Sequence, residues 1–192
     1  MANTDNAFGL KPVQHRNGAP YNGAFRLYST ATGDGTAIYI GDPVILSGTS
    51  QTISGKIYSD VDQAATGDVI TGVVVGVMPV TQDSLRYRAA STQRLLMVAD
   101  DPSLLFEIQE VSGGTALTAN DAGLNANFVV GTGSTVTGLS GVELNNATEA
   151  ATNTLDVHIV GPVQREDNAI GEHCKWLVTI NRHQFANQVA GI

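Results

Sequence analysis

The sequence predicts a mostly β protein: a compact β-barrel or β-sandwich with short helical turns and an extended N-terminal arm. Turn-forming pairs such as Gly-Asp, Asn-Gly and Gly-Ser recur about every ten residues, and short runs rich in Val, Ile, Thr and Tyr lie between them. No segment keeps an apolar helical period over several turns, so long helices are not expected. With 192 residues, the chain is long enough to bury a real core in one domain or two small ones.

Strands are expected wherever β-branched or alternating residues run between turns, at 37–40, 44–46, 69–77, 94–99, 103–111, 128–130, 155–160 and 175–180. The run 69–77 is β-branched almost throughout, so both of its faces should be buried. Gly72 and Gly76 within it indicate a bulge or a close backbone approach.

Residues 103–111 alternate clearly. Leu104, Phe106 and Ile108 share one face of the expected strand, and Glu107 and Gln109 fall on the other. Leu155, Val157 and Ile159 are expected to point inward in the same way, as are Trp176, Val178 and Ile180. Single helical turns are expected at 118–125, with Asn120 or Asp121 as the cap, at 145–151, and at 60–65, where a loop is the alternative.

The two ends differ from the middle of the chain. Residues 1–28 are predicted to form an extended arm, because they are rich in Gly, Pro and Asn and carry spaced aromatic anchors. Residues 29–183 are predicted to form the β core, with a loop-rich outer insertion at 131–153. Residues 184–192 are predicted to be a polar tail or a short helix.

The charge balance excludes some partners. There are 10 Lys and Arg residues against 18 Asp and Glu residues, which gives a net charge of −8 with neutral His. This balance argues against nucleic acid and anionic membranes as partners, because nothing neutralises phosphate at the level of the whole chain. The N-terminus has no basic region followed by an apolar one, so synthesis in the cytoplasm without a signal peptide is expected.

The sequence offers no pattern for catalysis, a metal or a cofactor. The single cysteine, Cys174, excludes an intramolecular disulfide, and no His-Glu-x-x-His or His-x-His motif is present. There is no Gly-x-Ser-x-Gly elbow, and no lysine follows a glycine as in a phosphate loop. We therefore expect a non-enzymatic protein without metal or cofactor.

Basic and aromatic residues on an acidic chain indicate a contact surface for an acidic partner, since Arg and Tyr are enriched at interface centres. Two groups stand out, one on the arm and one in the polar stretch 81–93. The candidate contact residues are Phe8, Lys11, His15, Arg16, Tyr21, Phe25 and Arg26 on the arm, and Arg86, Tyr87, Arg88 and Arg94 beyond it.

Three stretches resemble small structural proteins of tailed bacteriophages, the cement or decoration proteins that stabilise the capsid. They are Phe8-Gly9-Leu10-Lys11-Pro12-Val13 with Asn17-Gly18-Ala19-Pro20-Tyr21-Asn22-Gly23, the turn Gly41-Asp42-Pro43-Val44, and Trp176-Leu177-Val178-Thr179-Ile180-Asn181-Arg182-His183-Gln184-Phe185. The resemblance implies a mostly β protein on the outside of the virion head. It would bridge capsomers of the major capsid protein, commonly as a homotrimer at three-fold positions.

Three other functions stay open. The chain could be another virion component, in the tail or at the head–tail junction, and its copy number in the virion would separate these cases. It could be a carbohydrate-binding surface module, which would show exposed aromatic side chains on one sheet face. An all-β hydrolase is disfavoured, because no acid, base and nucleophile set can be assembled from neighbouring strands.

Overall fold

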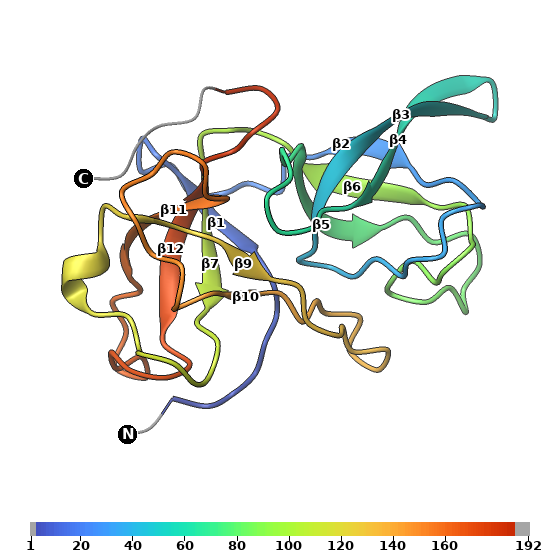
Figure 1. The fold of residues 1–192 in the computed structure, drawn as a ribbon. Coiled ribbons are helices and arrows are strands. Elements are labelled where there is room, and N and C mark those ends of the chain that lie inside the picture. The colour runs from blue at the N-terminus through green and yellow to red at the C-terminus, as the bar shows by residue number, and fades with distance from the viewer. Residues whose placement is uncertain (1–2, 187–192) are drawn as a thin grey trace.

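The computed structural model describes residues 3–186, which form two β assemblies lying side by side (Figure 1). One is a five-stranded sheet of order β1-β7-β12-β11-β8, and the other is a closed barrel of order β2-β4-β3-β5-β6. Strands β9 and β10 form a separate two-stranded ribbon. The predicted mostly β class is confirmed, with a barrel and an open sheet in the same chain.

The elements, in chain order, are β1 (Lys11–His15), β2 (Arg26–Ser29), β3 (Pro43–Ile53), β4 (Lys56–Gln63), β5 (Gly72–Val77), β6 (Leu95–Ala99), β7 (Leu104–Gln109), the 3-10 turn η1 (Ala119–Asp121), β8 (Asn125–Ala126), β9 (Phe128–Val129), β10 (Glu143–Leu144), β11 (Val157–Pro162) and β12 (Lys175–Ile180). The turn η1 is the single helical element within residues 3–186. Its N-cap is Thr118, two positions before Asn120, the nearer of the two predicted caps, and Asp121 completes the capping box.

The barrel is built around the long hairpin of β3 and β4, which projects beyond the other strands in Figure 1. Ser54 and Gly55 at its tip have φ of 50° and 76°, the positive pair that a two-residue type I′ turn requires. Strand β2 closes the barrel by pairing with β6 on one side and, through Ser29 and Asp60, with β4 on the other. The register shift between Val74 and Gly76 in β5 confirms the predicted bulge.

The sheet and the barrel share a hydrophobic core. Leu104, Phe106 and Ile108 of β7 point into it as predicted, and Trp176 of β12 is fully buried beside them. The same cluster takes in residues of the barrel side, namely Ala64, Ile70, Val73 and Ala99. The barrel therefore packs directly on the sheet. The predicted core spans 29–183; the two assemblies also take in Leu10, β1 and β2, and they meet at one continuous apolar junction, while a second, smaller cluster fills the barrel itself.

The predicted N-terminal arm, residues 1–28, is wrong for residues 11–15 and 26–28. The first of these segments is β1, which pairs with β7 at the edge of the sheet, and the second lies in β2, which closes the barrel. Proline is tolerated in an edge strand, where its missing N–H costs no ladder bond, and the pairing shifts register just after Pro12. Leu10 is only 1% exposed, so the segment is anchored in the core.

Three other expectations need correction. Residues 60–63 continue strand β4 where a helical turn or a loop was expected, because Val61 points into the barrel and Asp60 is satisfied by side-chain donors. Residues 145–151 contain turns and no helix. The insertion 131–153 is not wholly external, since Val142 and Leu144 are fully buried. Of the predicted tail, residues 187–192 lie outside the described residues.

Candidate contact surfaces and a candidate metal centre

Two loops of the barrel side, residues 80–88 and 131–141, form a surface that we call the loop platform. They are far apart in sequence, but residues 38–40 run between them. Ile38 and Arg88 exchange two backbone hydrogen bonds of 2.9 and 2.8 Å, and Ile40 N–H donates to Gly138 O at 2.9 Å. The predicted strand at 37–40 is thus present as bridges that tie both loops to the body of the molecule.

Close packing fixes the shape of the loop platform. The rings of Tyr39 and Tyr87 stack with their centroids 4.8 Å apart and an interplanar angle of 16°. A Cβ atom at Gly133 would lie 2.3 Å from the ring of Tyr39, and one at Gly138 would lie 2.7 Å from Cβ of Arg86. The small residues of 131–141 therefore allow an approach that larger ones would block.

The loop platform presents aliphatic side chains to solvent. Val136 is 88% exposed, Val80 77% and Leu85 47%, and the exposed Arg86 lies against Gly138 beside them. Exposed aliphatic side chains on two loops that pack against each other offer a candidate contact surface for another macromolecule.

Arg88 does not fit the predicted partner contact, because it is fully buried. Its guanidinium pairs with Asp34 at 2.7 Å and donates to the carbonyl oxygens of Ala31, Thr36 and Thr92. The five N–H donors of a guanidinium can satisfy several backbone carbonyl oxygens in loops where no strand pairs with them. Arg88 therefore organises these loops from within.

The other members of the same predicted group divide between structure and surface. Arg94 is half-buried and donates to Ser84 Oγ at 3.2 Å, which braces the turn that precedes Leu85. Tyr87 is half-buried in the stack with Tyr39. Arg86 is the member of this group that the structure leaves exposed.

Four predicted arm residues meet in a hollow of about 540 Å³ at the junction of sheet and barrel. They are His15, Tyr21, Phe25 and Arg26, and they are joined there by Asp100, Asp101 and Phe185. His15 Nδ1 lies 3.2 Å from Asp101 Oδ2, and Arg26 Nη1 lies 3.2 Å from Asp100 Oδ2. We call this site the junction hollow.

The charges of the junction hollow are shared within the protein. Tyr28 O–H donates to Asp100 Oδ2 at 2.8 Å, and burial together with this carboxylate raises the pKa of Tyr28 to about 12. Burial opposes ionisation of Asp101, but hydrogen bonds from Ser103 and the neighbouring His15 outweigh it and lower the pKa of that carboxyl. In this hollow, Arg26 and His15, both predicted to meet an acidic partner, therefore already lie beside carboxylates of this chain.

The remaining arm residues line two other hollows. Phe8 and Lys11 border an apolar groove of about 310 Å³ between the N-terminal segment and the barrel, which Tyr21 also lines. Arg16 borders a hollow of about 530 Å³ over β11 and β12, where its Nη2 donates to Thr179 Oγ1 at 3.0 Å. In that hollow, burial and then the charge of Arg16 lower the pKa of His158. The predicted arm residues thus line three separate hollows.

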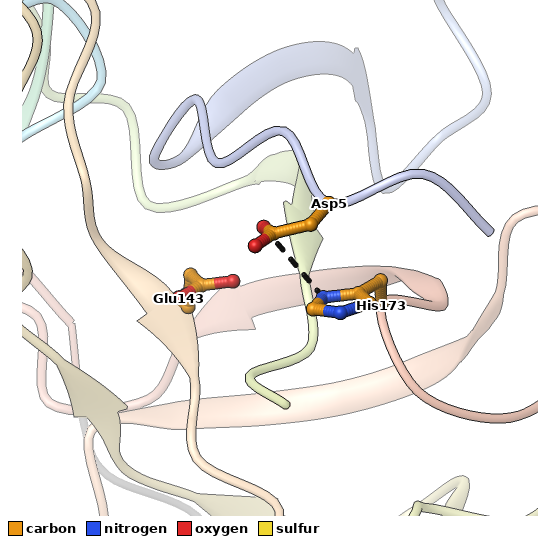
Figure 2. A group of neighbouring side chains, drawn as sticks. All are labelled: Asp5, Glu143 and His173. Atoms are coloured by element: carbon orange, nitrogen blue, oxygen red, sulfur yellow. Dashed lines mark ion pairs between the residues drawn. The ribbon is translucent and has the colours of Figure 1, made fainter. Parts of the chain in front are cut away.

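A polar cluster that the sequence did not predict is built from Asp5, Glu143 and His173. Each offers one metal-ligating atom, and these atoms all lie within 4.8 Å of one another. Figure 2 shows the three side chains converging from the N-terminal segment, β10 and the loop before β12. The buried amide of Gln109 donates to Asp5 Oδ1 at 3.0 Å and to Glu143 Oε1 at 2.9 Å. This is the group of side chains that could hold a cation.

No family model matches the chain, and neither a curated protein nor a solved structure matches it. Within residues 3–186, no helix is long and apolar enough to cross a membrane. Support for a function therefore comes from the sequence resemblance and from the surfaces described above.

Proposed function

We propose that this chain is a structural protein of a tailed-phage virion that binds the outer surface of the head and stabilises it. In this proposal it bridges capsomers of the major capsid protein, as a homotrimer at three-fold positions. The observation that carries the proposal is the loop platform, where firmly packed loops hold Val80, Leu85 and Val136 out in solvent. The resemblance of three sequence stretches to phage cement proteins supports it.

Burial of these side chains on a neighbour would supply the binding energy. A fully buried aliphatic side chain contributes about 1.5–3 kcal/mol relative to an exposed one. Because the loops are already fixed by the Tyr39–Tyr87 stack and by backbone bonds to residues 38–40, little conformational entropy would be lost on docking. Three linked copies would add their contacts through a raised effective concentration.

Stabilisation of the head would follow from linkage. A subunit that binds the assembled lattice and not the free capsomers lowers the free energy of the lattice alone. The stiff β architecture suits this role, since the shared core of sheet and barrel resists bending between two docking points. No chemical step is needed for such a function.

Two of the three stretches that carry the resemblance meet at one point of the fold, the N-terminal one and the turn at Gly41. Leu10 N–H donates to Gly41 O at 2.9 Å, and Gly9 and Gly41 both have positive φ, 73° and 98°. A Cβ on Gly9 would lie 2.4 Å from Gly41 O, and one on Gly41 would lie 2.3 Å from Phe8 O. These motifs therefore build the crossing of the N-terminal segment over the turn at the start of β3. A protein with the same motifs would share this crossing.

Co-sedimentation with heads that lack this protein tests the proposal. We expect the unmodified chain to sediment with such heads, and Val136→Asp to weaken binding by at least about tenfold, since a charge would have to be desolvated at the contact. Ile170→Asp is the control, because Ile170 is also an exposed aliphatic residue, at 51% against 88% for Val136, and lies in the loop between β11 and β12. An equal loss of head binding in both variants, or unchanged head binding in both, would contradict the role of the loop platform.

One observation favours a second candidate, a carbohydrate-binding module. Phe25 and Phe185, 45% and 48% exposed, line the junction hollow together with Tyr21, and carboxylates lie beside them. Aromatic faces beside hydrogen-bonding groups suit sugar rings. A glycan array probed with the chain and with Phe25→Ala would decide. Saturable binding that Phe25→Ala abolishes, together with no head binding, would favour this function over the first.

A further inference from the structure

The polar cluster lies away from the loop platform and has no part in the function proposed above. We propose that Asp5, Glu143 and His173 bind a transition-metal dication of the Zn²⁺ class, and that the ion fixes the N-terminal segment to the sheet. The candidate ligands come from three parts of the chain that no local sequence motif connects: the segment before β1, strand β10 and the residue two places before β12.

The geometry supplies three convergent ligand atoms. They lie within 4.8 Å of one another, and His173 Nδ1 is 3.7 Å from Asp5 Oδ1 (Figure 2). A small inward movement of each side chain would place the three atoms about 2.0–2.2 Å from a shared Zn²⁺, the distance at which this ion binds imidazole nitrogen and carboxylate oxygen. Asp5 is 68% exposed, so the site has an open side for entry of the ion and for a water ligand.

The charge balance of the cluster favours a cation. Two carboxylates face each other, and Glu143 is half-buried. A dication would neutralise both carboxylates at once, in a protein whose net charge is −8.

The amide of Gln109 contacts all three candidate ligands. Its Nε2 donates to Asp5 Oδ1 at 3.0 Å and to Glu143 Oε1 at 2.9 Å, and His173 Nδ1 lies 3.4 Å from it. Its orientation is fixed, because Gln109 Oε1 accepts from the N–H of Asn6 at 3.0 Å. Both amide hydrogens are thus used on the carboxylates, and in the tautomer that carries its proton on Nε2, His173 offers the lone pair of Nδ1 to a metal ion.

Gln109 would then act as an outer-shell group. A carboxylate oxygen has two lone pairs, so Asp5 Oδ1 and Glu143 Oε1 can each ligate the ion and keep the hydrogen bond from the buried amide. Hydrogen bonds of this kind orient metal ligands and hold them in place. An imidazole nitrogen among the ligands selects Zn²⁺, Co²⁺ or Ni²⁺ over Mg²⁺ and Ca²⁺, which prefer sets made of oxygen alone.

The N-terminal segment is already positioned for this role. The Asn3 amide donates to the carbonyls of Ala169 and Glu172 at 2.7 and 2.8 Å, and Ala169 N–H donates back to Asn3 Oδ1 at 3.0 Å. Asp5 is therefore held beside the loop that carries His173. An ion bound there would cross-link three segments and oppose release of the N-terminal segment.

Calorimetric titration of the chelator-treated chain, made without a polyhistidine tag, tests the proposal with Zn²⁺ alone. We expect one ion per chain and a higher melting temperature with Zn²⁺ than with chelator. Bound Co²⁺ should give the visible absorption of a site with nitrogen and oxygen ligands. Mg²⁺ at the same concentration should leave the melting temperature unchanged.

Two variants and one control make the outcome decisive. Asp5→Asn removes an exposed carboxylate and should weaken Zn²⁺ binding by at least about tenfold. His173→Asn should do the same, and Asn suits the φ of 59° at this position. Asp167→Asn, which removes a carboxylate of the same 68% exposure elsewhere, should bind Zn²⁺ as the unmodified chain does. Absence of one-to-one binding, or equal affinity in Asp5→Asn and Asp167→Asn, would overturn the proposal whether or not the chain binds heads.

Discussion

At the scale of single residues, buried polar side chains hold the irregular segments of this protein. Glu110 is fully buried and accepts from Trp176 Nε1 at 2.9 Å, from Leu117 N–H at 2.8 Å and from Asn146 Nδ2 at 3.1 Å. Arg88, a buried cation, donates to Ala31 O and Thr92 O and pairs with Asp34, so it joins the loops at 31–36 and 89–92. In each case one side chain satisfies several groups that no strand pairs, so its loss leaves them unsatisfied together.

Arg88→Lys should therefore be strongly destabilising although it keeps the charge. A lysine has no planar fork and cannot reach Asp34 and three carbonyl oxygens at once. We expect a loss of about 2–4 kcal/mol in the free energy of unfolding, measured by urea denaturation. Arg86→Lys, two positions away on the surface, is the control and should change stability by less than about 0.5 kcal/mol. Equal stability of Arg88→Lys and the unmodified chain would contradict the role given to this guanidinium.

At the scale of elements, a carboxylate at the start of a strand joins one assembly to the other. Asp156 directly precedes β11, and its Oδ1 accepts from Gly67 N–H of the turn between β4 and β5 at 3.0 Å. Its backbone carbonyl accepts from Asn181 N–H at 2.8 Å, just after β12. The residue thus connects the sheet to the barrel side, and its second carboxylate oxygen has no partner among the described residues.

This arrangement predicts a pH dependence of stability. Burial raises the pKa of Asp156 from 3.8 to about 6, so the folded state holds the proton more tightly than the unfolded chain between these values. The stabilisation from protonated Asp156 is complete below pH 3.8 and is lost as the pH rises through 6. Asp156→Asn should remove this slope and raise stability at pH 7.5 by about 1–3 kcal/mol.

Thermal unfolding of both proteins from pH 4 to pH 8 measures this effect. The gain from Asp156→Asn should grow with pH and level off above about pH 7. Asp167→Asn, on the surface, should leave the profile of the unmodified chain in place. A gain that is the same at every pH would show that the buried charge of Asp156 is not its cause.

Prediction from sequence succeeded where a strand buries alternate side chains. Residues 175–180 were predicted with the bounds that β12 has, because Trp176, Val178 and Ile180 alternate without interruption. It failed for β1 and β2, where Gly, Pro and Asn dominate the local pattern but an open strand edge supplies backbone partners. Tertiary pairing decided these segments, and local propensity did not.

The candidate sites were predicted only in part, for a related reason. A cluster such as Asp5, Glu143 and His173 leaves no spacing in the sequence, because three distant segments meet through the sheet order. Arg88 shows the converse: its neighbours in sequence suggest a surface, while its contacts place it in the interior. Burial of a charged residue depends on partners that the sequence does not put nearby.

At the scale of the whole molecule, the chain combines a stiff body with a separate presenting surface. The shared core joins sheet and barrel, and the loop platform extends from the barrel side. The hairpin of β3 and β4 also projects, with Ile57 75% exposed near its tip. A body of this kind can touch two neighbours at once, which is what bridging on a capsid surface requires.

Image reconstruction of heads to which the chain has been added tests this account most directly. The account predicts added density on the outer surface, at three-fold positions and in hundreds of copies per head, with the loop platform against a neighbouring subunit. Density confined to the tail or to the head–tail junction, or heads that carry no added density at saturating chain, would contradict it.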